Sequence, residues 1–174
     1  TACHRVIIPF MLFMFRAPQR SSLAVSSAAS VGYKRPILAL ERDRVFAGDW
    51  VSPGLAAELP KPRERLTWSI AGRPMFCVRG ADGLIRTFSN VCRHRMMTLV
   101  EGDGTGLRIT CPYHAWTYDL EGHLVGTNHM EATDGVDEAD VCLPEVRTEV
   151  WQGWLYSPRT SDALHVAERL APPR

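Results

Sequence analysis

The sequence predicts an all-β domain built from antiparallel strands. Short apolar segments of strand-like composition recur between residues 66 and 157, and glycine-containing turns separate them. The chain has 174 residues, of which 45% are hydrophobic, so it can form one compact domain with extensions. Its formal net charge is +1, and no basic face with interleaved aromatic residues is present, so we expect no nucleic-acid partner.

Residues 1–35 are expected to form an N-terminal extension. The apolar run at residues 6–15 is too short to cross a bilayer, which needs about 20 residues, so we expect no membrane association. The serine-rich stretch that follows lacks acidic residues, as organelle transit peptides do. We favour an arbitrary upstream start, with Met11 or Met14 as the true first residue. The expected location is the bacterial cytoplasm, with a plastid as the alternative.

A helix is predicted over residues 36–50, because Pro36 suits a first helical turn and apolar residues recur on one side. Residues 51–160 form the predicted β domain, and residues 161–174 a tail with a short helix. Residues 131–149 contain seven acids and one arginine, which predicts a solvated loop. The expected strands cover residues 66–70, 75–79, 84–89, 107–110, 116–120, 123–126 and 150–157.

The most specific motif pairs Cys92-Arg93-His94 with Cys111-Pro112-Tyr113-His114, sixteen residues further on. Each short segment offers one cysteine and one histidine. This donor set suits a Rieske [2Fe–2S] cluster, in which two imidazoles replace two thiolates on one iron. We therefore expect the two cysteines on the buried iron and the two histidines on the outer iron.

Two other metal sites are weaker interpretations of these residues. Zinc also accepts two Cys and two His, but zinc fingers pair Cys with Cys and His with His at short spacing. A zinc-stabilised interaction domain is therefore a remote alternative. Asp119, His123 and His129 resemble a two-His-one-carboxylate iron site by composition, but a strand hairpin would spread them apart. We expect surface histidines there instead.

The residues around the motif, Asn90–Arg95 and Cys111–Asp119, closely resemble the Rieske domain of Rieske non-haem iron oxygenase α subunits. The resemblance extends from about Leu38 through Trp154. It implies a Rieske-type antiparallel β-sandwich with a cluster-binding subdomain, preceded by a short helix. It also implies that Cys92, His94, Cys111 and His114 bind the cluster. One departure is Met96, where the family usually has glycine.

Four further residues are expected to surround the cluster. Arg93 and Arg95 flank His94, and nearby cations favour the reduced cluster. Tyr113 and Trp116 are expected to shield it, and the resemblance implies that Trp116 packs beside it. The second cysteine pair of respiratory-chain Rieske proteins is missing, which favours the oxygenase or ferredoxin type.

The resemblance implies an oxidoreductase that transfers single electrons to a mononuclear iron for O₂-dependent hydroxylation or demethylation. That iron would lie in a catalytic domain beyond this chain, in a neighbouring subunit of a homo-oligomer such as a trimer. We therefore expect no catalytic residue in these 174 residues. The electron donor would be a reductase or a ferredoxin. The main alternative is a stand-alone Rieske ferredoxin.

Overall fold

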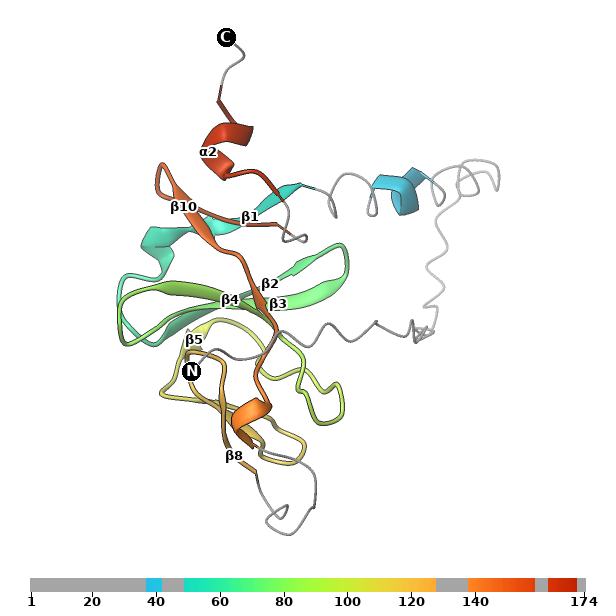
Figure 1. Cartoon of the computed structure of the whole chain (residues 1–174), viewed down its shortest axis with the longest axis vertical. Coiled ribbons are helices and arrows are strands. Elements are labelled where there is room, and N and C mark those ends of the chain that lie inside the picture. Colours follow the sequence, from blue (N-terminus) through green and yellow to red (C-terminus); the bar gives the residue numbers. More distant parts are fainter. Residues whose placement is uncertain (1–36, 42–48, 128–137, 159–162, 172–174) are drawn as a thin grey trace, which may run out of the picture.

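The computed structural model describes residues 37–41, 49–127, 138–158 and 163–171 (Figure 1). Its strands are β1 (Trp50–Leu55), β2 (Glu64–Ile70), β3 (Arg73–Arg79), β4 (Ile85–Ser89), β5 (Gly104–Thr105), β6 (Ile109–Thr110), β7 (Thr117–Tyr118), β8 (Leu124–Gly126), β9 (Glu145–Val146), β10 (Glu149–Trp151) and β11 (Trp154–Pro158). The helical elements are residues 37–41, η1 (Ala56–Glu58), η2 (Glu138–Asp140) and α2 (Val166–Arg169). None of these described helices is long and apolar enough to cross a membrane.

The strands form three sheets, and every strand pair is antiparallel. The central sheet has the order β5-β2-β3-β4-β9. The outer sheet has the order β1-β11-β10, and the loop sheet has the order β6-β7-β8. This architecture confirms the predicted all-β fold with short helices.

Strand β3 lies in the middle of the molecule, with one hydrophobic cluster on each side. Phe76 and Val78 belong to the larger cluster, which also contains buried residues of β6, β7 and β8. Cys77 belongs to the smaller cluster, which contains Leu155 of β11. Because successive side chains of a strand point to opposite faces, one strand serves both clusters. The central sheet is therefore packed between the outer sheet and the loop sheet.

Two buried contacts join the central and outer sheets. The Ser157 hydroxyl donates a hydrogen bond to Thr87 Oγ1 at 3.1 Å, and both residues are fully buried. The second contact is the packing of Cys77 with Leu155 of β11 in the smaller cluster. Cys77 is fully buried, and burial raises the pKa of its thiol to about 11. Cys77 therefore acts as a small core residue, as buried cysteines generally do.

Most predicted strands are found within a few residues of their expected bounds, and three details differ. The helix predicted over residues 36–50 is seen at 37–41, but Trp50 begins a strand, so the helix does not reach that residue. The segment 150–157 is a hairpin, because Gln152 and Gly153 take positive φ angles and reverse the chain. The acidic segment contributes β9 and η2 to the fold. Residues 1–36 and 128–137 lie outside the described part.

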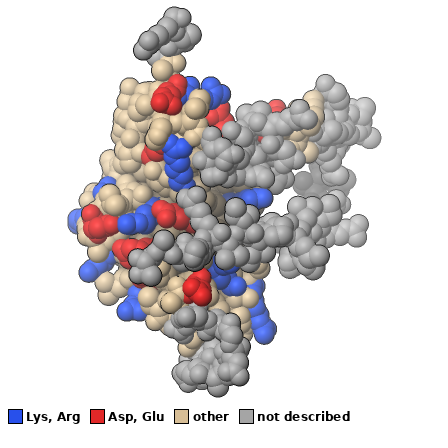
Figure 2. All heavy atoms as spheres, in the orientation of Figure 1, with Lys and Arg blue, Asp and Glu red and all other residues tan. Residues whose placement is uncertain are grey.

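The face of the molecule shown in Figure 2 carries Lys, Arg, Asp and Glu side chains interspersed over its described part. Neither sign of charge dominates that face, in keeping with the small net charge of the sequence.

Gly122 turns the chain between β7 and β8, and it lies directly against the central sheet. Its φ is +91°, and a Cβ atom built there would lie 2.6 Å from Cε1 of buried Phe88. Gly83 also has a positive φ, +82°, but a Cβ atom there would meet nothing within 4 Å. The two glycines therefore separate the cost of the backbone conformation from the cost of a steric clash.

We predict that Gly122→Ala lowers the free energy of unfolding by about 2–5 kcal/mol, the sum of left-handed strain and overpacking. Gly83→Ala is the control and loses only the backbone part, about 1–2 kcal/mol. Urea denaturation of both variants measures the difference. Equal losses would contradict the packing of this turn against Phe88.

Candidate metal centre

The first loop of the site leaves the central sheet at the end of β4. Its two ends are joined by an isolated bridge between Val91 and Thr98. Cys92 N donates to Met97 O at 2.8 Å, and Met96 N donates to Cys92 O at 3.1 Å. The five residues from Cys92 to Met96 therefore form a tight loop at the edge of the core.

The second loop, between β6 and β7, repeats this hydrogen-bond pattern. Cys111 N donates to Trp116 O at 2.8 Å, and Ala115 N donates to Cys111 O at 3.0 Å. In both loops the cysteine bonds to the residues four and five positions later. The two loops thus present their cysteines in the same local geometry, although their histidines follow at different spacings.

Each loop contains a non-glycine residue in the left-handed region four positions after its cysteine. Met96 has a φ of +56° and Ala115 a φ of +55°. Such residues carry strain of about 1–2 kcal/mol, which glycine avoids. The predicted preference for glycine at position 96 therefore has a physical basis, and Met96 takes the required conformation without it.

The two cysteines face each other inside the larger hydrophobic cluster. Cys92 is fully buried, and Cys111 is 3% exposed. Burial raises the pKa of the Cys92 thiol, the hydrogen bond from Tyr118 opposes the rise, and the neighbouring Cys111 adds to it. Two thiols packed together in an apolar core offer soft ligands at a site that excludes water.

The two histidines lie together on the outer side of the thiols. Their ring centroids are 4.7 Å apart, and both residues are half-buried. The Nδ1 atoms of His94 and His114 are buried and have no hydrogen-bond partner. Burial first, then the charges of His114 and Arg95, lower the pKa of His94 and favour the neutral ring that binds metals.

The donor set fits a Rieske cluster. A buried imidazole nitrogen without a partner loses its bonds to water, so two of them in one place need an explanation. Coordination of a metal would supply the missing partner to both nitrogens. The grouping of two thiols inside and two imidazoles outside also fits a cluster with a Cys₂ iron and a His₂ iron.

Two aromatic side chains support the histidine rings. Trp116 is buried and stacks on His94, with ring centroids 4.8 Å apart and an angle of 8° between the planes. Tyr113 lies against His114 at 3.7 Å but is 57% exposed. Trp116 thus covers one imidazole from the core side, and Tyr113 flanks the other at the surface.

Tyr118, on β7, is a further site residue, which the spacing of the motif does not indicate. It is fully buried, and its hydroxyl lies 3.5 Å from Cys92 Sγ and accepts a hydrogen bond from Arg93 N at 3.1 Å. Burial, with the Cys92 hydrogen bond, raises the pKa of Tyr118, so the phenol keeps its proton. A protonated phenol can donate to a thiolate. Its signal in the sequence is its position on a strand directly after the second loop.

Asn90 is a second site residue whose role the motif spacing does not indicate. It fixes the base of the first loop. Its Oδ1 accepts from Leu99 N at 3.2 Å and from Val100 N at 3.0 Å. Its Nδ2 donates to Val100 O at 2.8 Å. One buried amide therefore replaces the strand pairing that the loop interrupts.

The remaining candidates are two arginines at the edge of the centre and the residues around Asp119. The backbone of Arg93 belongs to the Tyr118 contact, whereas Arg95 is exposed and acts on His94 through its charge. Asp119 accepts from Glu121 N and His123 N and lies 3.2 Å from the His123 ring, so it stabilises the hairpin turn. His129 is outside the described part. Among the residues described, no group of three or more acids, cysteines and histidines could hold a single metal ion. A two-iron cluster differs from such a site, because each of its irons takes only two protein ligands.

Comparison with known proteins gives a family match over the same region. The model of the Rieske [2Fe-2S] domain matches residues 49–146. The carnitine monooxygenase oxygenase subunit of Acinetobacter baumannii is 31% identical over 131 residues, which cover 75% of this chain and 35% of that protein. The biphenyl 2,3-dioxygenase α subunit of Rhodococcus jostii is 34% identical over 125 residues, 71% of this chain and 27% of that protein.

Solved structures show the same relationship. The apo form of a quaternary ammonium Rieske monooxygenase superposes with a TM-score of 0.72 at 30% identity, covering 76% of this chain and 39% of that one. Naphthalene 1,2-dioxygenase superposes with a TM-score of 0.73 at 27% identity, covering 78% and 31%. The chain therefore spans about a third of the length of these relatives. It belongs to the Rieske [2Fe-2S] domain family and is homologous to the Rieske region of Rieske oxygenase α subunits.

Proposed function

We propose that Cys92, His94, Cys111 and His114 hold the Rieske cluster and that this chain is the electron-transfer part of an oxygenase α subunit. The observation that carries the proposal is the pair of unpartnered, buried Nδ1 atoms in the same two loops as two buried thiols. When bound, a [2Fe–2S] cluster accepts and releases one electron at a time.

The residues of this chain set the two sides of the site. The thiols and Trp116 lie in the core and exclude water from the inner side. The half-buried histidines lie between this core and the surface, where Tyr113 is exposed. The imidazole side is therefore the side at which an electron enters and leaves.

The proposed electron acceptor is a mononuclear iron in a separate catalytic domain, which hydroxylates or demethylates a substrate with O₂. The relatives favour an oxygenase subunit over a stand-alone carrier, because they are oxygenase subunits about three times as long as the matched region. The loop sheet and α2 lie at opposite ends of the molecule (Figure 1). A domain following α2 in the same subunit would thus lie far from the histidines, which favours an acceptor in a neighbouring subunit.

The proposed donor is a reductase or a ferredoxin that reaches the same exposed edge. Arg95 and Tyr113 are exposed beside the histidines and provide a cation and an aromatic ring for that contact. Specific contacts of this kind combine charge, which steers the encounter, with aromatic burial.

We predict that the purified chain binds two irons and two acid-labile sulfides and shows a rhombic EPR signal when reduced. His114→Ala and His94→Cys are expected to abolish that signal, because each removes one of the imidazole nitrogens. His123→Ala is the matched control and keeps the signal, since His123 is half-exposed and bonds to Asp119. Metal analysis and EPR of the three variants test the assignment. One zinc per chain would overturn it.

Tyr118→Phe is predicted to lower the reduction potential. The hydroxyl proton beside Cys92 Sγ stabilises the additional negative charge of the reduced site. Loss of one hydrogen bond of about 0.5–1.5 kcal/mol corresponds to about 20–60 mV for a one-electron couple. A spectroelectrochemical titration measures the shift. Tyr156→Phe on β11 is the control, and an equal shift in both variants would contradict the role of Tyr118.

A further inference from the structure

The outer sheet carries an unusual number of aromatic residues on the surface that faces away from the core. Cross-strand partners point to the same face, and Leu55, Trp154 and Trp151 are paired across the three strands. Tyr156, two residues beyond Trp154, shares that face and contacts Trp151 edge-on at 6.5 Å. We call this surface the aromatic face; it consists of Trp50, Leu55, Trp151, Trp154 and Tyr156.

Half of the aromatic face is open. Trp154 is 46% exposed, and its partner Leu55 is 36% exposed. Neighbouring apolar side chains on a sheet with free edges are an interaction site in a soluble protein, because water solvates them poorly. Tryptophan and tyrosine are enriched in the centres of such interfaces.

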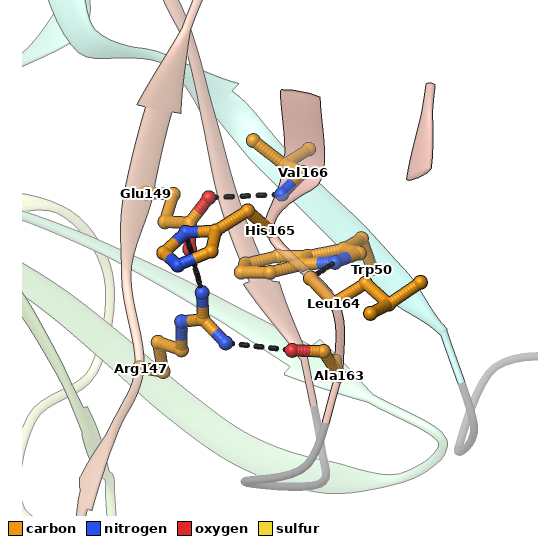
Figure 3. A network of polar contacts seen from close by, with 7 residues as sticks. All are labelled: Trp50, Arg147, Glu149, Ala163, Leu164, His165 and Val166. Atoms are coloured by element: carbon orange, nitrogen blue, oxygen red, sulfur yellow. Dashed lines mark hydrogen bonds and ion pairs between the residues drawn. The ribbon is translucent and has the colours of Figure 1, made fainter. Parts of the chain in front are cut away.

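The other half of the aromatic face is covered by residues 163–171, which we call the outgoing segment. Trp50 Nε1 donates to Leu164 O at 2.9 Å (Figure 3). Arg147 Nη1 donates to Ala163 O at 2.7 Å, and its guanidinium lies 5.2 Å from the centre of the Trp50 ring. Glu149 Oε2 accepts from Val166 N at 2.9 Å.

These contacts form a clamp of Trp50, Arg147 and Glu149 on the main chain of the outgoing segment. The clamp is itself held together, because Glu149 Oε1 forms an ion pair with Arg147 and lies 2.9 Å from His165 Nδ1. Burial raises the pKa of Glu149, but the Val166 hydrogen bond and the pairing with Arg147 together outweigh it, so the pKa is lowered. Glu149 therefore remains an anion and an acceptor at neutral pH.

Burial alone gives little reason for this segment to be fixed. Helix α2 has four residues, and Val166 is its one buried side chain. Leu164 and Leu170 are 64% and 43% exposed. A second ion pair, between Arg169 and Asp49 at 2.6 Å, fastens the far end of the segment beside β1. The side chains thus fix the path of a segment that buries little apolar surface of its own.

We propose that the domain that follows this region in the polypeptide packs against the open half of the aromatic face. In this arrangement the clamp directs the connecting chain onto that surface. The proposal rests on the proposed function. The occupant is named from the length of the relatives, of which this chain covers 27–39%, and from the path of the outgoing segment along this face. Interfaces between domains of one chain typically bury 600–1,500 Å², which an aromatic patch of this kind can initiate.

Hydroxyl-radical footprinting of two polypeptides tests the proposal. One is the 174-residue chain, and the other continues through the sequence encoded after Arg174. Labelling of Trp154 is expected to fall roughly fourfold in the longer polypeptide, as its exposure falls from 46% to that of an interface core. Leu84, which is 60% exposed in the turn before β4, is the internal control and is labelled equally in both.

Equal labelling of Trp154 in both polypeptides would overturn the proposal, as would coding sequence that ends at Arg174. Protection of Trp154 in the short chain that depends on its concentration would assign the face to a second copy instead, and would also overturn it. The EPR signal of each sample reports separately on the proposed function. A lost signal with Trp154 still protected would reject the cluster ligands and leave the interface.

The clamp has its own test in the same chain. Glu149→Ala is expected to accelerate amide exchange of Val166 roughly tenfold, because the amide loses its acceptor. Asp82→Ala, which removes a comparable surface ion pair with Arg86, is the matched control and leaves Val166 exchange unchanged. Unchanged exchange in Glu149→Ala would contradict the clamp.

Discussion

The backbone hydrogen bonds that close the loops at Cys92 and Cys111 determine where four donor side chains can point. Each loop returns its chain within five residues, so the cysteine faces the core while the histidine lies nearer the surface. The core supplies the other half of the constraint, because both sulfurs lie among apolar side chains that belong to the central and loop sheets. The remaining structure holds these two loops face to face: Asn90 braces the first, and strands β6 and β7 join the ends of the second.

This arrangement places energetically unfavourable features at the site. Met96 and Ala115 occupy the left-handed region, and the two Nδ1 atoms have no hydrogen-bond partner in the folded chain. Strain of this kind persists when the surrounding structure over-determines it, and it gathers at functional sites. A metal bound at both nitrogens would replace the hydrogen bonds that they lack. We infer that binding of the cluster and stability of the loops are linked.

The donor set and the antiparallel strands could be predicted from the sequence because both are local: cysteine and histidine spacing selects a cluster type, and strands alternate between turns. Tyr118, Asn90 and the Glu149 clamp could not be predicted in the same way. Their roles depend on partners 9 to 114 residues away along the chain, and register decides which of them meet. The helix predicted to reach Trp50 failed for a related reason: pairing of Trp50 with Pro158, more than a hundred residues later, overrides a local helical pattern.

The molecule thus has two proposed interaction sites, the histidine edge near the loop sheet and the aromatic face on the outer sheet. The central sheet separates them. The central claim is that the two Nδ1 atoms bind the cluster. The most direct measurement is electron–nuclear double resonance of the reduced protein labelled with ¹⁵N at histidine Nδ1 alone. Strong couplings to two labelled nitrogens are predicted. Couplings that persist only in Nε2-labelled protein, or that come from one histidine, would contradict the account.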